Sequence, residues 1–149
     1  MELFDLIKSD HKKVKATLEK LMKSSSSAKK SREQGLERLQ EDLLPHMYAE
    51  EHLFYPLMME EADREMALEA LEEHKAARMV LHELQAVAAG DEHWHPRLKL
   101  LTELLTHHIQ EEESTIFDQA EQCIDSERAE ELGKQFQDLK KHAKVEEMA

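Results

Sequence analysis

The chain has 149 residues and a formal net charge of −13 at pH 7, and this length suits one domain with a hydrophobic core. Such a charge repels polyanions, so we expect neither nucleic acid nor an anionic membrane as a partner. No run of 18 apolar residues is present, Cys123 is the single cysteine, and the stretch MELFDLIKSD lacks the pattern of a secretion signal. We therefore expect a cytoplasmic protein.

The composition is that of an all-helical protein. Three glycines, three prolines and an aromatic content of 5% stand beside many leucine, glutamate, lysine and alanine residues, and we expect no strands. Apolar residues recur at steps of three and four in long segments, which predicts helices at about residues 2–22, 31–61, 63–89 and 98–117. A weaker stripe predicts a shorter fifth helix over residues 125–143.

Several residues predict where these helices begin, bend or end. Ser31 with Gln34 predicts a capping box at the start of the second helix, and Asp63 is a candidate cap for the third. Pro45 and Pro56 fall inside the second helix and predict a bend or an irregularity there. The segment GDEHWHP, residues 90–96, ends the third helix and starts the fourth, and we expect the last few residues of the chain to fray.

Short connections between four long amphipathic helices predict an up-down-up-down four-helix bundle with a short extra C-terminal helix. We treat residues 1–149 as a single domain. Its bundle core covers about residues 2–123, and the C-terminal helix or tail covers about residues 125–149.

Histidines and glutamates interrupt the apolar stripes of all four bundle helices. The second and fourth helices repeat a His-x-x-x-Glu pair, and the first and third each carry one histidine. These six residues are His11, His46, Glu50, His74, His108 and Glu112. At about 1.5 Å per residue, all six lie roughly 15 to 22 Å from their helix ends, near one level of the bundle.

Buried carboxylates need a compensating cation. An unpaired ionised carboxylate costs several kcal/mol or more in a protein interior, so the two glutamates predict a buried metal centre. Imidazole with carboxylate, and no nearby thiolate, suits iron, manganese or zinc, and two carboxylates in one cavity suit two bridged ions. A lone histidine on an apolar stripe is more often a packed core residue, and only the matched set of six favours a metal.

Other ligand-type residues are weaker candidates. His107 and Glu111 share the spacing of the neighbouring pair but lie on a different helix face. Glu51 and Glu113 lie off the stripes, and their carboxylates could orient a ligand imidazole.

The segments HMYAEEHLFYP and HIQEEESTIFD resemble the His-x-x-x-Glu-Glu segments of hemerythrin-like proteins, also called the HHE cation-binding domain. DHKKV around His11 and EEHKAAR around His74 complete the order of ligands, and the resemblance extends from about residue 3 to 120. It implies a non-haem centre of two iron ions, with His11 and His46 on one ion and His74 and His108 on the other. Glu50 and Glu112 would bridge them, and manganese or zinc are possible substitutes.

The resemblance also implies a small ligand, which would be dioxygen, nitric oxide or peroxide. Arg78 departs from the pattern, because oxygen-carrying members have a second histidine one turn after the residue matching His74. An arginine cannot replace that ligand, so we expect one iron to keep an exchangeable position and Arg78 to pair with a carboxylate near the centre.

Two other classes of function remain open at this point. A ferritin-like di-iron oxidase or iron-handling protein would carry Glu-x-x-His on two helices, but this sequence has that spacing only from Glu92 to His95, before Pro96. A metal-free helical interaction module would need Glu50 and Glu112 to face solvent.

Overall fold

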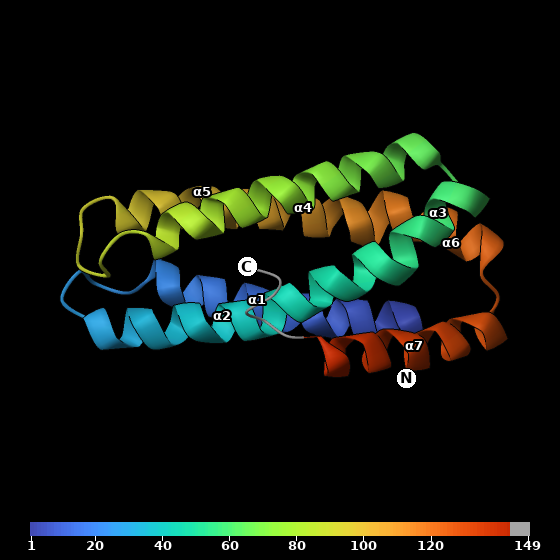
Figure 1. Cartoon of the computed structure of the whole chain (residues 1–149), viewed down its shortest axis with the longest axis horizontal. Helices are drawn as coiled ribbons and strands as arrows, with labels where there is room; N and C mark the ends of the chain where they lie inside the picture. Colours follow the sequence, from blue (N-terminus) through green and yellow to red (C-terminus); the bar gives the residue numbers. More distant parts are fainter. Residues whose placement is uncertain (144–149) are drawn as a thin grey trace.

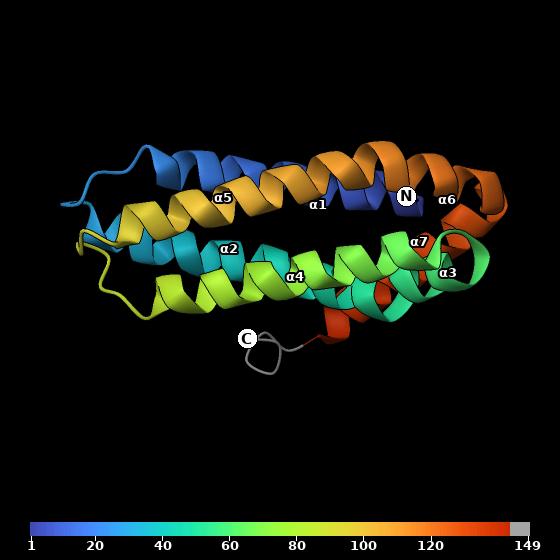
Figure 2. The same ribbon diagram turned by 90° about the horizontal axis from the view of Figure 1, so that it is seen from above.

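Four long helical segments lie side by side and alternate in direction in the computed structural model, which describes residues 1–143 (Figures 1 and 2). The first is α1 (Leu3–Met22), and the second runs through α2 (Lys29–Ala49), the π-helical turn η1 (Glu50–Phe54) and α3 (Tyr55–Glu61). The third is α4 (Arg64–Gln85), and the fourth runs through α5 (Trp94–Glu111), the π-helical turn η2 (Glu112–Ile116) and α6 (Phe117–Cys123). The expected all-α, up-down-up-down bundle is confirmed.

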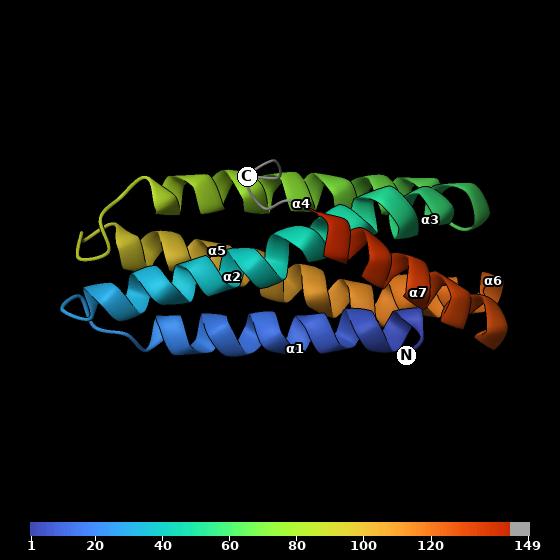
Figure 3. The same cartoon turned by 60° about the horizontal axis from the view of Figure 1, so that its bottom comes forward.

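The extra C-terminal helix is α7 (Ser126–His142), which turns back along the bundle and packs against α1 and α2 (Figure 3). The Asp125 side chain caps its first turn by accepting from the backbone N–H of Arg128 at 2.8 Å. Our expectation of frayed terminal residues concerns residues 144–149, which lie outside the described part of the chain.

Helix boundaries follow the sequence with three corrections, one of which is that the fourth helix runs from Trp94 to Cys123, beyond the expected residues 98–117. Asp63 caps α4 as expected and accepts from the Met66 N–H at 3.1 Å. The prediction of a capping box at Ser31 was wrong, because α2 already begins at Lys29 and no side chain caps its first turn. There the buried Arg32 donates to the carbonyl oxygens of Ser24 and Ala89 at 2.9 and 2.7 Å. The third helix ends at Gln85, earlier than the expected residue 89.

The core consists of two apolar clusters with a polar layer between them. Along α1, Ile7 belongs to one cluster and Val14 to the other, while the buried His11 lies between them. The irregularity expected in the second helix lies at this level, as the π-helical turn at Glu50–Phe54 between the two prolines. Within residues 1–143, no helix has both the length and the apolar character needed to cross a bilayer.

Candidate metal centre

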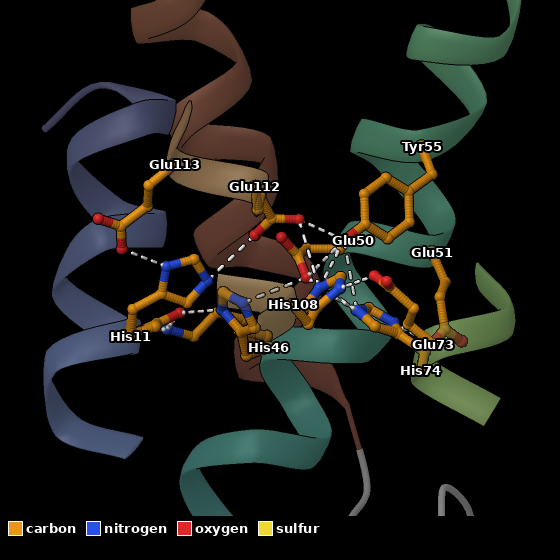
Figure 4. Close-up of polar contacts among 12 residues, drawn as sticks. His11, His46, Glu50, Glu51, Tyr55, Glu73, His74, His108, Glu112 and Glu113 are labelled. Carbon is orange, nitrogen blue, oxygen red and sulfur yellow. Dashed lines mark hydrogen bonds and ion pairs between the residues drawn. The ribbon is translucent and has the colours of Figure 1, made fainter. Parts of the chain in front are cut away.

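The six residues singled out in the sequence converge in the polar layer (Figure 4). Both glutamates have 0% of their surface exposed, and the four histidines have between 1% and 5%. Their ligand-type atoms form two groups in which all atoms lie within 4.8 Å of one another. One group is His11, His46, Glu50 and Glu112, and the other is Glu50, His74 and His108.

Glu50 belongs to both groups. Its Oε1 lies 3.2 Å from His46 Nε2 and 3.2 Å from His74 Nε2, so one carboxylate oxygen faces an imidazole of each group. Glu112 also spans the centre, with Oε1 at 3.0 Å from His11 Nε2 and Oε2 at 3.6 Å from His108 Nε2.

Each glutamate begins a π-helical turn, and this local structure brings in a residue that the sequence analysis missed. A π-helical turn holds more residues than an α-helical one, so the side chain five positions after Glu50 also faces the centre. That residue is the fully buried Tyr55, whose hydroxyl lies 3.2 Å from Glu50 Oε1 and makes its shortest contact with Glu112. It is also 3.3 and 3.1 Å from the Nε2 atoms of His74 and His108.

Each of the four imidazoles makes its outer contact with a carboxylate. The distances from Nδ1 are 2.6 Å for His11–Glu113, 2.8 Å for His46–Asp10, 2.7 Å for His74–Glu51 and 2.7 Å for His108–Glu73. A proton on Nδ1 that is donated to a carboxylate leaves the Nε2 lone pair directed inward, which is the arrangement of metal-binding histidines.

Two of these outer carboxylates, Asp10 and Glu73, were not predicted. The signal was present in the sequence, because each of the four is the chain neighbour of a ligand-type residue yet contacts a histidine of a different helix. The adjacent pairs are Asp10–His11, Glu50–Glu51, Glu73–His74 and Glu112–Glu113. The contacts expected of Glu51 and Glu113 are present.

Lysine and arginine side chains form ion pairs with two of the outer carboxylates. Lys140 Nζ lies 2.7 Å from each oxygen of Asp10, and Arg78 Nη2 lies 2.9 and 2.7 Å from the oxygens of Glu51. Burial alone would raise the pKa of Glu51, but the contacts with His74 and Arg78 outweigh it and hold that pKa below its usual value. The expected pairing of Arg78 with a carboxylate is therefore present.

The electrostatics of the centre favour a compensating positive charge. Burial and the neighbouring Glu112 carboxylate raise the pKa of Glu50 well above its usual value. Burial works against the charged form of His108, yet Glu73, Glu112 and Glu50 raise its pKa to about 9. A bound cation would supply the positive charge that these two shifts call for.

The donor set fits a metal. Among the described residues, three buried polar side-chain atoms lack a hydrogen-bond partner, and all three face the centre. They are His11 Nε2, Glu50 Oε2 and Glu112 Oε1, of which the first and last lie 3.0 Å apart as an ion pair without hydrogen-bond geometry. His11 and Glu50 also line a cavity of about 10 Å³, together with apolar side chains such as Val14 and Leu105. Buried nitrogen and oxygen atoms without a hydrogen-bond partner are what a bound cation would satisfy.

The family model of the hemerythrin HHE cation-binding domain matches residues 2–120. The chain belongs to this family. Membership in the hemerythrin family confirms the resemblance read from the four ligand-bearing segments, and together with the buried histidine and glutamate cluster it supports metal binding.

A solved structure and a curated sequence are similar to this hemerythrin-family chain. The crystal structure of a hemerythrin HHE cation-binding domain-containing protein from Mycobacterium kansasii superposes with a TM-score of 0.82 at 20% identity, covering 95% of this chain and 86% of that one. That likeness shows the fold. A protein from Nostoc sp. named DNA nickase is 26% identical over 140 residues, and the match covers 94% of this chain but only 39% of that protein's length.

Proposed function

We propose that this chain is a cytoplasmic non-haem di-iron protein whose centre binds, senses or reacts with dioxygen, nitric oxide or peroxide. The observation that carries the proposal is the sharing of Glu50 between two buried groups of ligand-type atoms. A carboxylate between two sets of imidazoles suits two ions held close together.

The residues divide between the two ions by their positions. His11 and His46 would hold one ion, His74 and His108 the other, and Glu50 and Glu112 would contact both. Manganese or zinc are possible substitutes for iron, since imidazole and carboxylate also suit these ions. Arg78 offers no ligand atom and is engaged with Glu51, and the Tyr55 hydroxyl is the further polar group beside the Nε2 atoms of His74 and His108.

The chain's own residues would support a small ligand in distinct ways. Bound iron would supply the redox chemistry, while the cavity of about 10 Å³ leaves room only for a very small molecule. Burial and the two central carboxylates raise the pKa of Tyr55 well above its usual value, so its hydroxyl keeps a proton within reach of both. The outer carboxylates hold the four imidazoles in orientation.

The two alternative functions, a metal-free interaction module and a ferritin-like di-iron protein, have less support. A metal-free interaction module would need exposed carboxylates, but both central glutamates are fully buried. The Glu92 to His95 spacing typical of ferritin-like sites lies at the end of the bundle, where α5 begins, away from the centre.

Metal content tests the di-iron proposal. Metal-free protein is loaded with ferrous iron under anaerobic conditions, desalted and analysed, and we expect about two iron ions per chain. Glu50→Ala should lose both ions, whereas Glu60→Ala, an exposed glutamate on α3, should retain them. An iron content near wild type in Glu50→Ala would contradict the shared-carboxylate assignment.

Spectroscopy tests the ligand class. The reduced, loaded protein is mixed separately with dioxygen, nitric oxide and peroxide, and the visible absorption is followed over time. We expect at least one ligand to change the spectrum in the wild type and in Glu60→Ala. A spectrum unchanged by all three would refute a small-ligand role while leaving metal binding intact.

A further inference from the structure

Three more ligand-type side chains meet on the outer surface where α4 packs against α5. His107 Nε2 lies 3.5 Å from Glu111 Oε2 and 4.0 Å from Glu73 Oε2, and one ligand-type atom from each residue lies within 4.8 Å of the other two. The exposed fractions of the side chains of Glu73, His107 and Glu111 are 30%, 66% and 51%, so solvent reaches this group directly. We call these three residues the outer cluster.

The outer cluster is joined to the buried centre through one carboxylate. Glu73 Oε2 faces His107. Glu73 Oε1 accepts from His108 Nδ1 at 2.7 Å (Figure 4). The other nitrogen of the same ring, His108 Nε2, belongs to the group with His74 and Glu50. A single carboxylate and a single imidazole therefore separate the surface from the centre.

The other outer carboxylates show what is unusual about Glu73. Asp10 forms an ion pair with Lys140, and Glu51 forms one with Arg78. Within the described residues, no lysine or arginine forms an ion pair with Glu73 or Glu111, and their ion-pair partners are histidines. Glu113 likewise has only His11 as a partner, but it belongs to no further group of ligand-type atoms among residues 1–143.

The donor types of the outer cluster also suit a cation. Two carboxylates and one imidazole form a donor set that first-row divalent ions accept, with water completing the coordination.

We propose that Glu73, His107 and Glu111 form an outer site for a divalent metal ion, from which the ion passes to the buried centre beside His108. An ion at the outer cluster would draw the charge of Glu73 away from His108 Nδ1 and weaken the contact that fixes this ring. His108 is the ligand-type histidine that the outer cluster contacts directly, through Glu73 Oε1. The destination of the ion rests on the proposed function, whereas the outer site itself does not.

The first experiment measures how fast metal-free protein takes up ferrous iron. The test variant is His107→Ala with Glu111→Ala, which leaves Glu73 and its contact with His108 in place. The matched control is Asp138→Ala with His142→Ala, since this pair on α7 has the same four-residue spacing, a 3.6 Å separation and side chains 76% and 72% exposed. We expect several-fold slower loading in the test variant only, with wild-type iron content in the buried centre at the end. Equal loading rates in all three proteins would overturn the passage of the ion.

The second experiment measures the outer site by itself. Protein whose centre is already loaded is titrated with zinc by calorimetry, and we expect one further, weaker ion in the wild type and the control but none in the test variant. The absence of that ion in the wild type, or its retention in the test variant, would overturn the outer site. Failure of the proposed function would instead appear as a buried iron content other than two in the wild type and the control.

Discussion

Tyr55 brings one hydroxyl group into contact with both central carboxylates. Its pKa is raised by burial and by those carboxylates, so in the metal-free protein the phenol is neutral and donates a hydrogen bond. Phe117 has the corresponding position five residues after Glu112, and its ring packs on Phe4 in the apolar cluster. The two halves of the bundle therefore differ at the residue that follows each π-helical turn.

We predict that Tyr55→Phe destabilises the metal-free protein by about 1–3 kcal/mol, because a buried carboxylate loses its donor. The loss should be smaller in the metal-loaded protein, where the ions neutralise the carboxylates. Urea unfolding of both forms measures the difference, and Tyr48→Phe, whose ring stacks on His52 outside the centre, is the control. An equal loss with and without metal would contradict this role of the hydroxyl.

Arg78 acts on the centre through Glu51. Arg78 donates to both oxygens of Glu51, the carboxylate that orients His74. We therefore predict that Arg78→Met lowers the affinity for the ion bound by His74 and His108 by about 10–100-fold. Competition with a chelator measures the affinity. Arg64→Met, which alters an exposed arginine at the start of α4, should leave it unchanged. Wild-type affinity in Arg78→Met would show that Glu51 orients His74 without help.

At the scale of elements, α7 contributes to the centre although it carries none of the six ligand-type residues. Lys140 forms an ion pair with Asp10, which contacts His46 Nδ1. Phe136 packs edge-on against the His46 ring, with 5.8 Å between the ring centroids. The C-terminal helix thus supports one histidine through both a charge and an aromatic contact.

We predict that Lys140→Met speeds the loss of one of the two ions, because Asp10 then orients His46 less firmly. Iron release to an excess of chelator should become biphasic, with one phase at the wild-type rate. Lys141→Met, at the exposed neighbouring position, is the control. A single phase at the wild-type rate in Lys140→Met would mean that α7 has no influence on the centre.

The six ligand-type residues could be predicted from the sequence because they interrupt apolar stripes at a regular period. Tyr55 could not be predicted in this way. The α-helical period directs Phe54 to the core, and only the π-helical turn also directs Tyr55 inward. Asp10 and Glu73 were concealed for another reason. A residue adjacent to a ligand lies about 100° away on the helix, so its contact with a neighbouring helix depends on packing that periodicity does not describe.

On the scale of the whole molecule, the polar layer divides the core into two apolar clusters. Its six ligand-type side chains are almost completely buried, and a bound cation would compensate the charge of the two central carboxylates. The stability of the bundle is therefore linked to occupancy of the centre, because ions that bind only the folded chain shift the folding equilibrium.

We predict that removing metal lowers the free energy of unfolding. A ligand at 100 times its dissociation constant adds about 2.7 kcal/mol, and two tightly held ions should add at least that much. Chemical unfolding with and without saturating metal measures the difference. Glu50→Ala is the internal control, since a protein that has lost both ions should unfold at the same denaturant concentration in either condition. Glu60→Ala should keep the full wild-type difference. Identical unfolding of the wild type with and without metal would rule out a buried metal centre in the middle of the bundle, because an ion satisfying Glu50, Glu112 and His11 cannot leave without cost.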